Sequence, residues 1–271
     1  MLLALLWMAF AGSARLLGRQ NRLLRVRAAH EQALTADLRR SGRRQLDELS
    51  DEFTVVAWDA PGAGGSSDPP ESFGMAGYAD CLAGFVERLG LERPHVAGLS
   101  FGGALALALY RRHPAVPVTL TLASAYAGWA GSLPPAEAEQ RLRQARVLAD
   151  LSPEEFVGTL LPTMFSAATP PETVDAFGAS MLAFHPAGFR AMARASAEDL
   201  RDVLPHIDVP TLLVYGDMDV RAPLTVAEDL HAAIPGSALV VLPDTGHAGN
   251  IEAPEAFNRA VRTFLGHRPT T

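Results

Sequence analysis

The 271-residue sequence has no lysine, only one cysteine and no apolar run long enough to span a membrane. Without lysine, the glycine-rich stretch PGAGGSSD at residues 61–68 cannot be a phosphate-binding loop of the GxxxxGK[ST] type. With Cys81 alone, no internal disulfide can form, and we interpret Cys81 as a small buried side chain. The apolar N-terminus MLLALLWMAFAGSA has 14 residues, whereas a spanning helix needs about 18, and no positive region precedes it. We therefore expect a cytoplasmic protein, with an N-terminal membrane anchor or export as the alternative.

The chain also lacks the basic surface that nucleic-acid binding requires. It carries 23 arginines against 30 acidic residues, a net charge of −7, so we expect no nucleic-acid partner. Residues 1–44 differ, because they hold nine arginines but only Glu31 and Asp37. Leucines recur there at broadly helical spacing, so we expect an atypical basic segment that is helical. A surface helix is the expectation, and a helix lying on a membrane or a partner is the alternative.

From residue 45 onward, short apolar runs rich in β-branched residues alternate with helix-like stretches. The runs lie at 53–58, 95–99, 118–124, 211–216 and 238–242 and are interpreted as buried strands. Helices are predicted between them at 78–89, 100–113, 226–233 and 254–265. This alternation predicts an α/β fold with a parallel sheet covered on both faces. Residues 130–205 break the alternation with a helical pattern interrupted by prolines, so they form a predicted helical lid between core segments 45–129 and 206–271.

The stretch HVAGLSFGGALALALY places Ser100 within a GxSxG motif between a predicted strand and a predicted helix. Gly98 and Gly102 permit a sharp turn that holds the serine in strained backbone geometry, with its hydroxyl exposed above the sheet. The helix that begins there points free N–H groups at the same place, so the amide of Phe101 is a candidate oxyanion donor. The motif predicts a nucleophilic serine.

A serine hydroxyl needs a base to take its proton and an acid to orient that base. His247 is the histidine that follows a late apolar strand, in PDTGHAGN. An earlier strand end, YGDMDVRAP, supplies two carboxylates, Asp217 and Asp219. The resulting chain order of serine, aspartate and histidine differs from the orders of chymotrypsin and subtilisin.

From about Arg43 to Leu265 the sequence resembles the α/β-fold hydrolases, through VVAWDAPGAGGSSDPP, HVAGLSFGG, HIDVPTLLVYGDMDVRAP and LPDTGHAGNIEAPEAFNRAVRTFL. The resemblance implies an α/β-hydrolase parallel sheet flanked by helices with an inserted helical lid. It also implies a catalytic acid in a GxxD loop, which selects Asp219 and leaves Asp217 and Asp244 as turn residues. Some relatives place the acid after the preceding strand, but ASAYAG has no carboxylate there. Within the family, the sequence is similar to 3-oxoadipate enol-lactonases and cofactor-free perhydrolases.

The N-terminus departs from the family pattern. Members enter this region through a central strand that ends in a His-Gly pair, and the loop after it donates the second oxyanion N–H. This sequence has no such pair, so we expect the N-terminal strands to be missing or replaced. Leu2 to Leu6 is the only apolar run that could take the strand's place, with Trp7 and Met8 then standing where the pair belongs. A shifted reading frame over residues 1–42 would explain the local excess of arginine.

These observations together predict a serine hydrolase that cleaves a small ester, thioester or lactone through an acyl-enzyme. Ser100, Asp219 and His247 are its expected catalytic residues, and neither a metal nor an organic cofactor is implied. The predicted partner is a small-molecule substrate, and the sequence specifies no oligomeric state. The alternative is an impaired or noncatalytic protein of the same fold that lacks a complete oxyanion hole.

For four further side chains we expect a structural role and not a functional one. His113 in RRHP and His206 in PHIDVP stand at a helix end and in a linker, so capping or surface roles are expected for both. Trp129 and Phe165 could line an acyl pocket, but we expect both to serve in packing.

Overall fold

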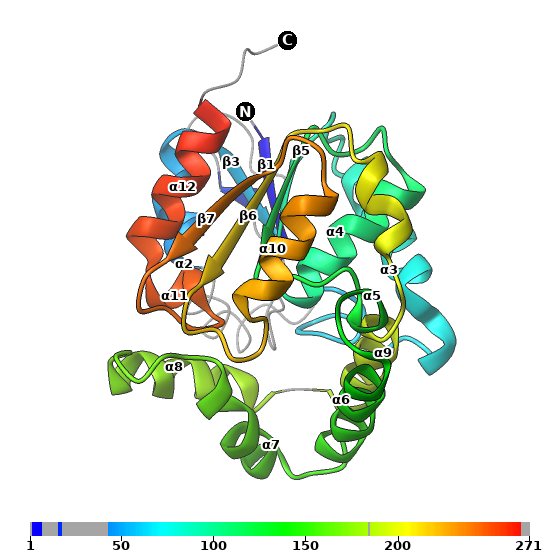
Figure 1. Ribbon diagram of the computed structural model, residues 1–271, viewed down its shortest axis with the longest axis vertical. Coiled ribbons are helices and arrows are strands. Elements are labelled where there is room, and N and C mark those ends of the chain that lie inside the picture. Colours follow the sequence, from blue (N-terminus) through cyan, green and yellow to red (C-terminus); the bar gives the residue numbers. More distant parts are fainter. Residues whose placement is uncertain (1, 7–15, 18–42, 184, 267–271) are drawn as a thin grey trace.

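The computed structural model describes residues 2–6, 16–17, 43–183 and 185–266 (Figure 1). Among these residues, seven strands form one sheet in the order β2-β3-β1-β4-β5-β6-β7. Neighbouring strands are parallel except for β2, which is antiparallel to β3. The strands are β1 Leu2–Leu6, β2 Leu16–Leu17, β3 Thr54–Ala57, β4 His95–Leu99, β5 Thr119–Ala123, β6 Thr211–Gly216 and β7 Ala238–Leu242.

Helices cover both faces of this sheet. The α-helices are α2 Arg43–Glu48, α3 Gly74–Arg88, α4 Phe101–Arg112, α5 Trp129–Ser132, α6 Pro135–Leu148, α7 Pro153–Leu160, α8 Pro171–Met181, α9 Pro186–Ser196, α10 Leu224–Ala233, α11 Gly249–Glu252 and α12 Pro254–Gly266. Short 3₁₀ helices are η1 Leu49–Asp51, η2 Glu71–Phe73, η3 Leu161–Thr163 and η4 Arg201–His206. In Figure 1, α2 and α12 lie on one side of the sheet, and α3, α4 and α10 lie on the other.

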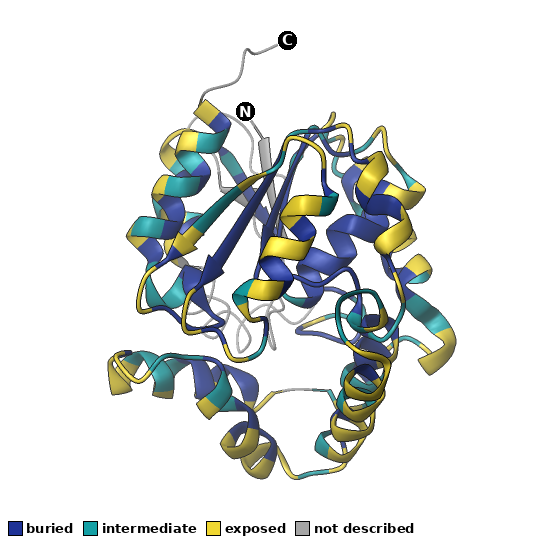
Figure 2. Cartoon of the chain, viewed as in Figure 1, coloured by how far each residue is buried: buried dark blue, intermediate teal, exposed yellow. Residues whose placement is uncertain are grey.

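The strands pack on both faces because alternate side chains point in opposite directions. In β6, Leu213 and Tyr215 join the apolar cluster shared with α3, α4 and α10, whereas Leu212 and Val214 join the cluster shared with α12. All six residues of β6 are buried, so neither face of this strand is exposed to solvent. Figure 2 shows the same pattern in the helices, which are buried on the side toward the sheet and exposed on the other.

The predicted α/β architecture is confirmed, and several boundaries agree closely. The strands at 95–99, 211–216 and 238–242 match β4, β6 and β7 to the residue, and those at 53–58 and 118–124 are shorter by one residue at each end. The four predicted core helices correspond to α3, α4, α10 and α12. The apolar runs were reliable because strands buried on both faces must be continuously hydrophobic.

The expectations for residues 1–44 need correction. The central strand is replaced rather than missing: β1 pairs with β3 on one side and β4 on the other, so Leu2–Leu6, the run that could take its place, occupies the centre of the sheet. The predicted helix is wrong at β1 and at Leu16–Leu17, which forms β2. Spacing of leucines suggested a helix, but pairing with neighbouring strands decides the conformation of such short apolar runs. Trp7, Met8 and the other residues between these strands and α2 lie outside the described residues.

The interpretation of Cys81 as a buried residue is wrong. Cys81 is exposed on α3. The buried side of this helix carries Tyr78, Leu82 and Val86, which are spaced four residues apart. A residue next to Leu82 is rotated by about 100° around the helix axis, so it points away from the core.

Between β5 and β6 the chain leaves the sheet and forms helices α5 to α9, within the segment expected to be a lid. Figure 1 shows α6, α7 and α8 beyond the carboxyl ends of β6 and β7. Helix α9 returns against the core, where a Cβ atom added to Gly188 would lie only 2.5 Å from the Cα of Gly62.

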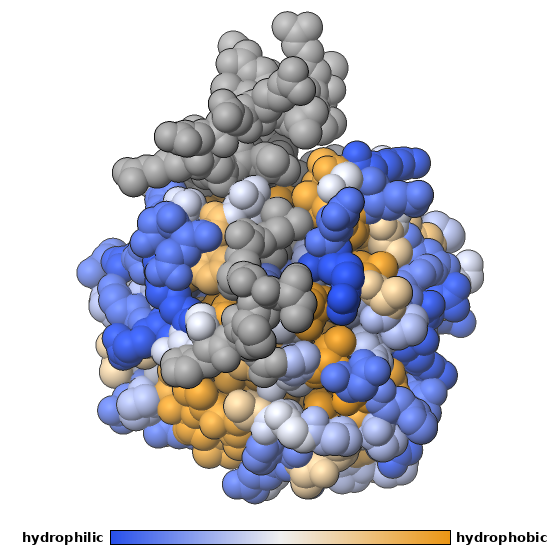
Figure 3. Space-filling view, turned by 90° about the horizontal axis from the view of Figure 1, so that it is seen from above, coloured by the Kyte–Doolittle hydropathy of each residue, from blue (hydrophilic) through white to orange (hydrophobic). Residues whose placement is uncertain are grey.

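On the face seen in Figure 3, apolar side chains are visible in the middle of the view among hydrophilic ones. None of the helices in the described part of the chain has the length and hydrophobicity needed to cross a membrane.

Candidate active site

Ser100 occupies a strained turn between β4 and α4. Its backbone has φ 54° and ψ −113°, a conformation that non-glycine residues rarely adopt. The turn is tight enough to exclude a side chain at Gly98, because a Cβ there would lie 2.1 Å from the carbonyl oxygen of Gly102. The Ser100 amide donates to the carbonyl of Ala123 on the next strand over 2.8 Å. The side chain stays partly accessible and lines a pocket.

Asp219 and His247 form a buried hydrogen-bonded pair. The Nδ1 atom of His247 lies 2.9 Å from Asp219 Oδ2 and 3.1 Å from Oδ1. Their side chains are 0% and 2% exposed, respectively. The structure therefore brings together the acid and the base that the sequence suggested, and it leaves the other imidazole nitrogen free of this pairing. His247 lines the same pocket as Ser100.

The Asp219 carboxylate is held by four donors. Backbone amides of Arg221 and Ala222 each donate to Oδ1 over 2.8 Å, in addition to the imidazole of His247. The side chain of Ser124, which follows β5, also donates to this carboxylate. Ser124 lies after β5, where some relatives carry the acid. Its hydroxyl supports the acid instead.

The loops that carry Asp219 and His247 are in direct contact. The amide of Met218 donates to the carbonyl of Thr245 over 2.9 Å, and the Thr245 amide donates to Asp217 Oδ1 over 3.2 Å. A Cβ atom at Gly216 would lie 2.0 Å from the Thr245 carbonyl oxygen, so glycine is required for this approach. Asp217 is exposed and acts as a turn residue between the two loops, as does Asp244 with its φ of 53°.

The histidine loop is also tied to the lid. Glu252 accepts hydrogen bonds from the amide of Gly246 at 2.8 Å and from that of Ser166 at 3.1 Å. The amide of Ala248 donates to the carbonyl of Met164 over 2.9 Å. These contacts flank His247 on both sides, so the segment at 164–166 positions the loop that presents the imidazole. No sequence pattern indicates this role of Glu252.

Burial and neighbouring charges set the protonation of the pair. Burial lowers the pKa of His247 below 6.5, although the charge and hydrogen bond of Asp219 oppose the shift. The positive charges of Arg221 and Arg141 lower it further. Burial alone would raise the pKa of Asp219, but His247 and the hydrogen bonds from Ala222 and Ser124 outweigh it and hold that pKa below 3.8. At neutral pH the site therefore contains a neutral imidazole beside an ionised carboxylate.

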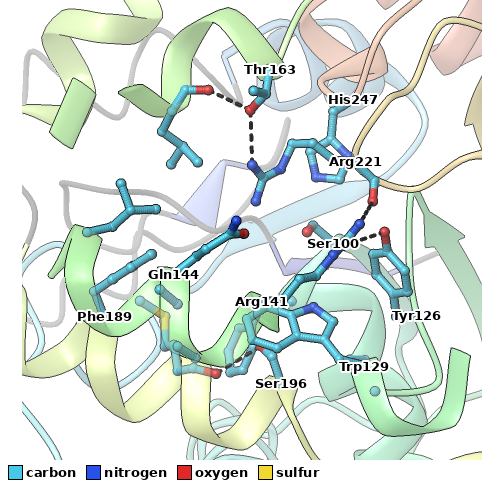
Figure 4. Close-up of a pocket in the computed structure, with 18 of the residues that line it drawn as sticks. Ser100, Tyr126, Trp129, Arg141, Gln144, Thr163, Phe189, Ser196, Arg221 and His247 are labelled. Atoms are coloured by element: carbon cyan, nitrogen blue, oxygen red, sulfur yellow. Dashed lines mark hydrogen bonds between the residues drawn. The ribbon is translucent and has the colours of Figure 1, made fainter. Parts of the chain in front are cut away.

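The pocket beside Ser100 is small and encloses about 250 Å³ (Figure 4). Its walls come from the turn at Ser100, from α6 and α9 of the lid, and from the loops after β5, β6 and β7. The apolar part includes Trp129 and Phe189, and the polar part includes Arg141, Gln144 and Arg221. Such a pocket suits a compact molecule with a few polar groups.

Phe101 begins α4 and lines the pocket next to Ser100. The first amides of an α-helix have no partner within the helix, so the Phe101 N–H is available to a developing negative charge. The candidate positions for a second donor, Trp7 and Met8, lie outside the described residues.

The remaining candidates have clear positions. His113 caps the end of α4 and contacts Asp80 over 2.7 Å, and His206 is exposed at the end of η4. Both lie outside the pocket lining. Trp129 packs against the core, as expected, and it also lines the pocket. Phe165 packs edge-to-face on Phe177 with ring centroids 5.3 Å apart, as expected.

Comparison with known proteins finds one matching family model and many similar proteins and solved structures. The model of the alpha/beta hydrolase family matches residues 27–260. A putative carbamate hydrolase from Pseudomonas syringae is 30% identical over 247 residues, covering 87% of this chain and 93% of that protein. A thermophilic esterase from Thermogutta terrifontis, solved with malate bound, superimposes with a TM-score of 0.80 at 29% identity, covering 98% of this chain and 90% of that one. The enol-lactonase from Burkholderia xenovorans gives a TM-score of 0.78 at 25% identity, with 98% and 92% covered.

Proposed function

Because the chain belongs to the alpha/beta hydrolase family, we propose that it cleaves a small ester, thioester or lactone through a serine acyl-enzyme intermediate. Its relatives are named as an esterase, an enol-lactonase and a carbamate hydrolase, and they support an ester or lactone hydrolase. Esters, lactones and carbamates differ in the bond that is cleaved, but each has a carbonyl carbon next to a leaving group. The observation that carries the proposal is the buried pair of Asp219 and His247 in one pocket with Ser100.

In the proposed reaction, Ser100 Oγ attacks the substrate carbonyl carbon while His247 accepts the hydroxyl proton. The oxyanion that forms is stabilised by the Phe101 amide, and one such donor contributes about 3 kcal/mol. His247 then gives its proton to the leaving oxygen or sulfur, and the acyl group remains on Ser100. A water molecule repeats the sequence, with His247 as base, and releases the acid. Asp219 holds the imidazole in the tautomer that presents its free nitrogen to Ser100.

Hydrolysis of p-nitrophenyl butyrate and δ-valerolactone tests this proposal. Turnover by the full chain should depend on Ser100, and Ser100→Ala should lower kcat by about 10⁴-fold or more, because the acyl-enzyme cannot form. A matched Ser66→Ala variant, in the loop after β3, controls for loss of a serine elsewhere. Equal activity of the Ser100→Ala protein would contradict the proposal. Absence of turnover in the unmodified chain would favour the noncatalytic alternative.

A further inference from the structure

Two arginine side chains from different parts of the chain line the pocket. Arg141 comes from α6 of the lid, and Arg221 follows β6 in the loop that carries Asp219. The two residues touch, because Arg141 Nη2 donates to the backbone carbonyl of Arg221 over 3.0 Å. Figure 4 shows Arg221 and Arg141 among the residues that surround the pocket, together with Ser100 and His247. Two positive charges therefore border the space where the proposed reaction takes place.

Few carboxylates in the described part of the chain form ion pairs with these two arginines. The guanidinium of Arg221 donates from Nη1 to the hydroxyl of Thr163 over 3.0 Å, and no carboxylate of the described residues forms an ion pair with it. Arg141 donates to the Tyr126 hydroxyl over 2.7 Å and has one carboxylate, Glu137, at 3.5 Å. The Glu137 side chain is 47% exposed, and such ion pairs contribute little.

The buried carboxylate of Asp219 acts on Arg221 through its charge but accepts no hydrogen bond from the guanidinium in the described structure. The oxygens of Asp219 already accept hydrogen bonds from His247 and from the backbone amides of Arg221 and Ala222. A guanidinium group has five N–H donors and stays charged, so Arg221 keeps donors that no described acceptor uses. Arg221 is only partly buried and lines the pocket, so an anion bound there can complete its hydrogen bonds.

We propose that the substrate carries a carboxylate in addition to its ester or lactone group, and that Arg221, supported by Arg141, binds this carboxylate. This inference rests on the proposed function and narrows its substrate class. Guanidinium groups bind carboxylates through paired hydrogen bonds, which fixes the orientation of the substrate as well as its position. A pocket of about 250 Å³ limits that substrate to a short chain. The carboxylate is unchanged in the reaction, in which the carbonyl–oxygen bond breaks and water supplies the new hydroxyl.

Matched pairs of charged and neutral substrates test the inference and locate the carboxylate. Monomethyl glutarate carries it on the acyl side and is compared with methyl 4-carbamoylbutanoate. O-butanoyl glycolate carries it on the alcohol side and is compared with O-butanoyl glycolamide. We expect kcat/KM for the charged member of one pair to exceed that of its amide by about 10- to 100-fold, as for a hydrogen bond to a charged group.

Variants connect this preference to the arginine. Arg221→Met should reduce the charged-to-neutral ratio of kcat/KM to near one, and Arg221→Lys should retain part of it. The control is Arg143→Met, which removes an exposed arginine on the same lid helix that pairs with Glu139 and lies outside the pocket lining. It should leave the ratio unchanged. No preference in either pair, or a preference that survives Arg221→Met, would overturn the inference while p-nitrophenyl butyrate hydrolysis still supports the proposed function.

A binding measurement separates the two proposals if no substrate is turned over. Glutarate should raise the Tm of the full chain, and this increase should be lost in Arg221→Met and kept in Arg143→Met. Glutaramide, which has the same shape without charge, should give no increase. If glutarate gives no Arg221-dependent increase, the anion site is rejected whatever the outcome of the activity assays.

Discussion

His247 shows how one residue balances burial against charge. Its side chain is 2% exposed, which disfavours the protonated form, and Asp219 at 2.9 Å favours it. Burial has the larger effect and lowers the pKa of His247 below 6.5, with Arg221 and Arg141 acting in the same direction. The imidazole is therefore neutral at neutral pH and can accept the proton of Ser100.

This shift predicts the acid limb of the pH dependence. Turnover requires neutral His247, so kcat/KM for p-nitrophenyl butyrate should rise with pH through a midpoint below 6.5. Arg221→Met removes a positive charge and should move the midpoint to higher pH. The lowered pKa of His247 also makes the stability of the fold depend on pH. The contribution of His247 to stability is present above pH 6.5 and is lost as pH falls below this value, because the unfolded chain then binds a proton that the buried imidazole resists. A midpoint well above 6.5 would contradict the assignment of His247 as the base.

The two aspartates after β6 should differ sharply in their effect on turnover. Asp219→Asn removes the charge that orients and stabilises His247, so we expect kcat to fall on the order of 10⁴-fold. Asp217→Asn keeps an oxygen that can accept from the Thr245 amide, so its effect should be small. Rates of both variants with p-nitrophenyl butyrate make the comparison, and the opposite ranking would move the catalytic role to Asp217.

The sequence was most informative where a local motif fixes the chemistry. Ser100, His247 and Asp219 follow from the GxSxG turn, the two late loops and the family resemblance. Ser124, Glu252 and the arginine pair could not be found in this way, because their partners lie far away in the chain. Glu252, for example, contacts Ser166, 86 residues earlier. Such long-range pairs leave no spacing pattern in the sequence.

At the scale of elements, Glu252 links α11 to both the histidine loop and the lid. Glu252→Ala leaves the amides of Gly246 and Ser166 without their acceptor, and the loss at the buried Gly246 costs about 1–3 kcal/mol. We expect kcat to fall more than KM rises, since the imidazole is no longer held in place. Glu252→Gln should recover part of the loss, because its amide oxygen can still accept.

Steady-state kinetics and urea unfolding of these variants separate positioning from stability. Glu154→Ala, at an exposed position on α7, is the matched control and should change neither quantity. If Glu252→Ala lowers stability but leaves kcat and the pH profile as they are, Glu252 does not position His247.

Sequence patterns favour a helical segment over residues 1–44 and offer Leu2–Leu6 only as the candidate replacement for the central strand, whereas pairing defines this run as β1. Ala4 lies opposite Val56 of β3 and Val96 of β4, so its backbone is at the centre of the sheet. A five-residue run of apolar residues has no periodicity that distinguishes strand from helix, and the absent His-Gly pair removed the usual landmark. The flanking strands β3 and β4, which are short apolar runs bounded by turn residues, were predicted closely.

The central position of β1 predicts a severe effect of proline. Ala4→Pro removes a backbone donor between two paired strands and should lower the free energy of unfolding by about 3 kcal/mol or more. Urea denaturation followed by circular dichroism measures this loss. An unfolding curve equal to that of the unmodified chain would show that the fold does not depend on β1.

At the scale of the whole molecule, the site exists only because distant parts of the chain meet at one edge of the sheet. Ser100 follows β4, Asp219 follows β6 and His247 follows β7, and parallel strands bring these ends together. The lid completes the enclosure by adding Arg141 and Trp129. The sheet therefore fixes the chemistry, while the lid sets the size and charge of the pocket.

Covalent labelling of Ser100 tests the central claim, an activated serine nucleophile, most directly. The full chain is treated with a fluorophosphonate probe, and intact mass and peptide mapping identify the modified residue. We predict one adduct per chain, on the peptide that contains Ser100, with labelling lost in Ser100→Ala and strongly slowed in Asp219→Asn. Labelling at another residue, or equal labelling of the Ser100→Ala protein, would contradict the account.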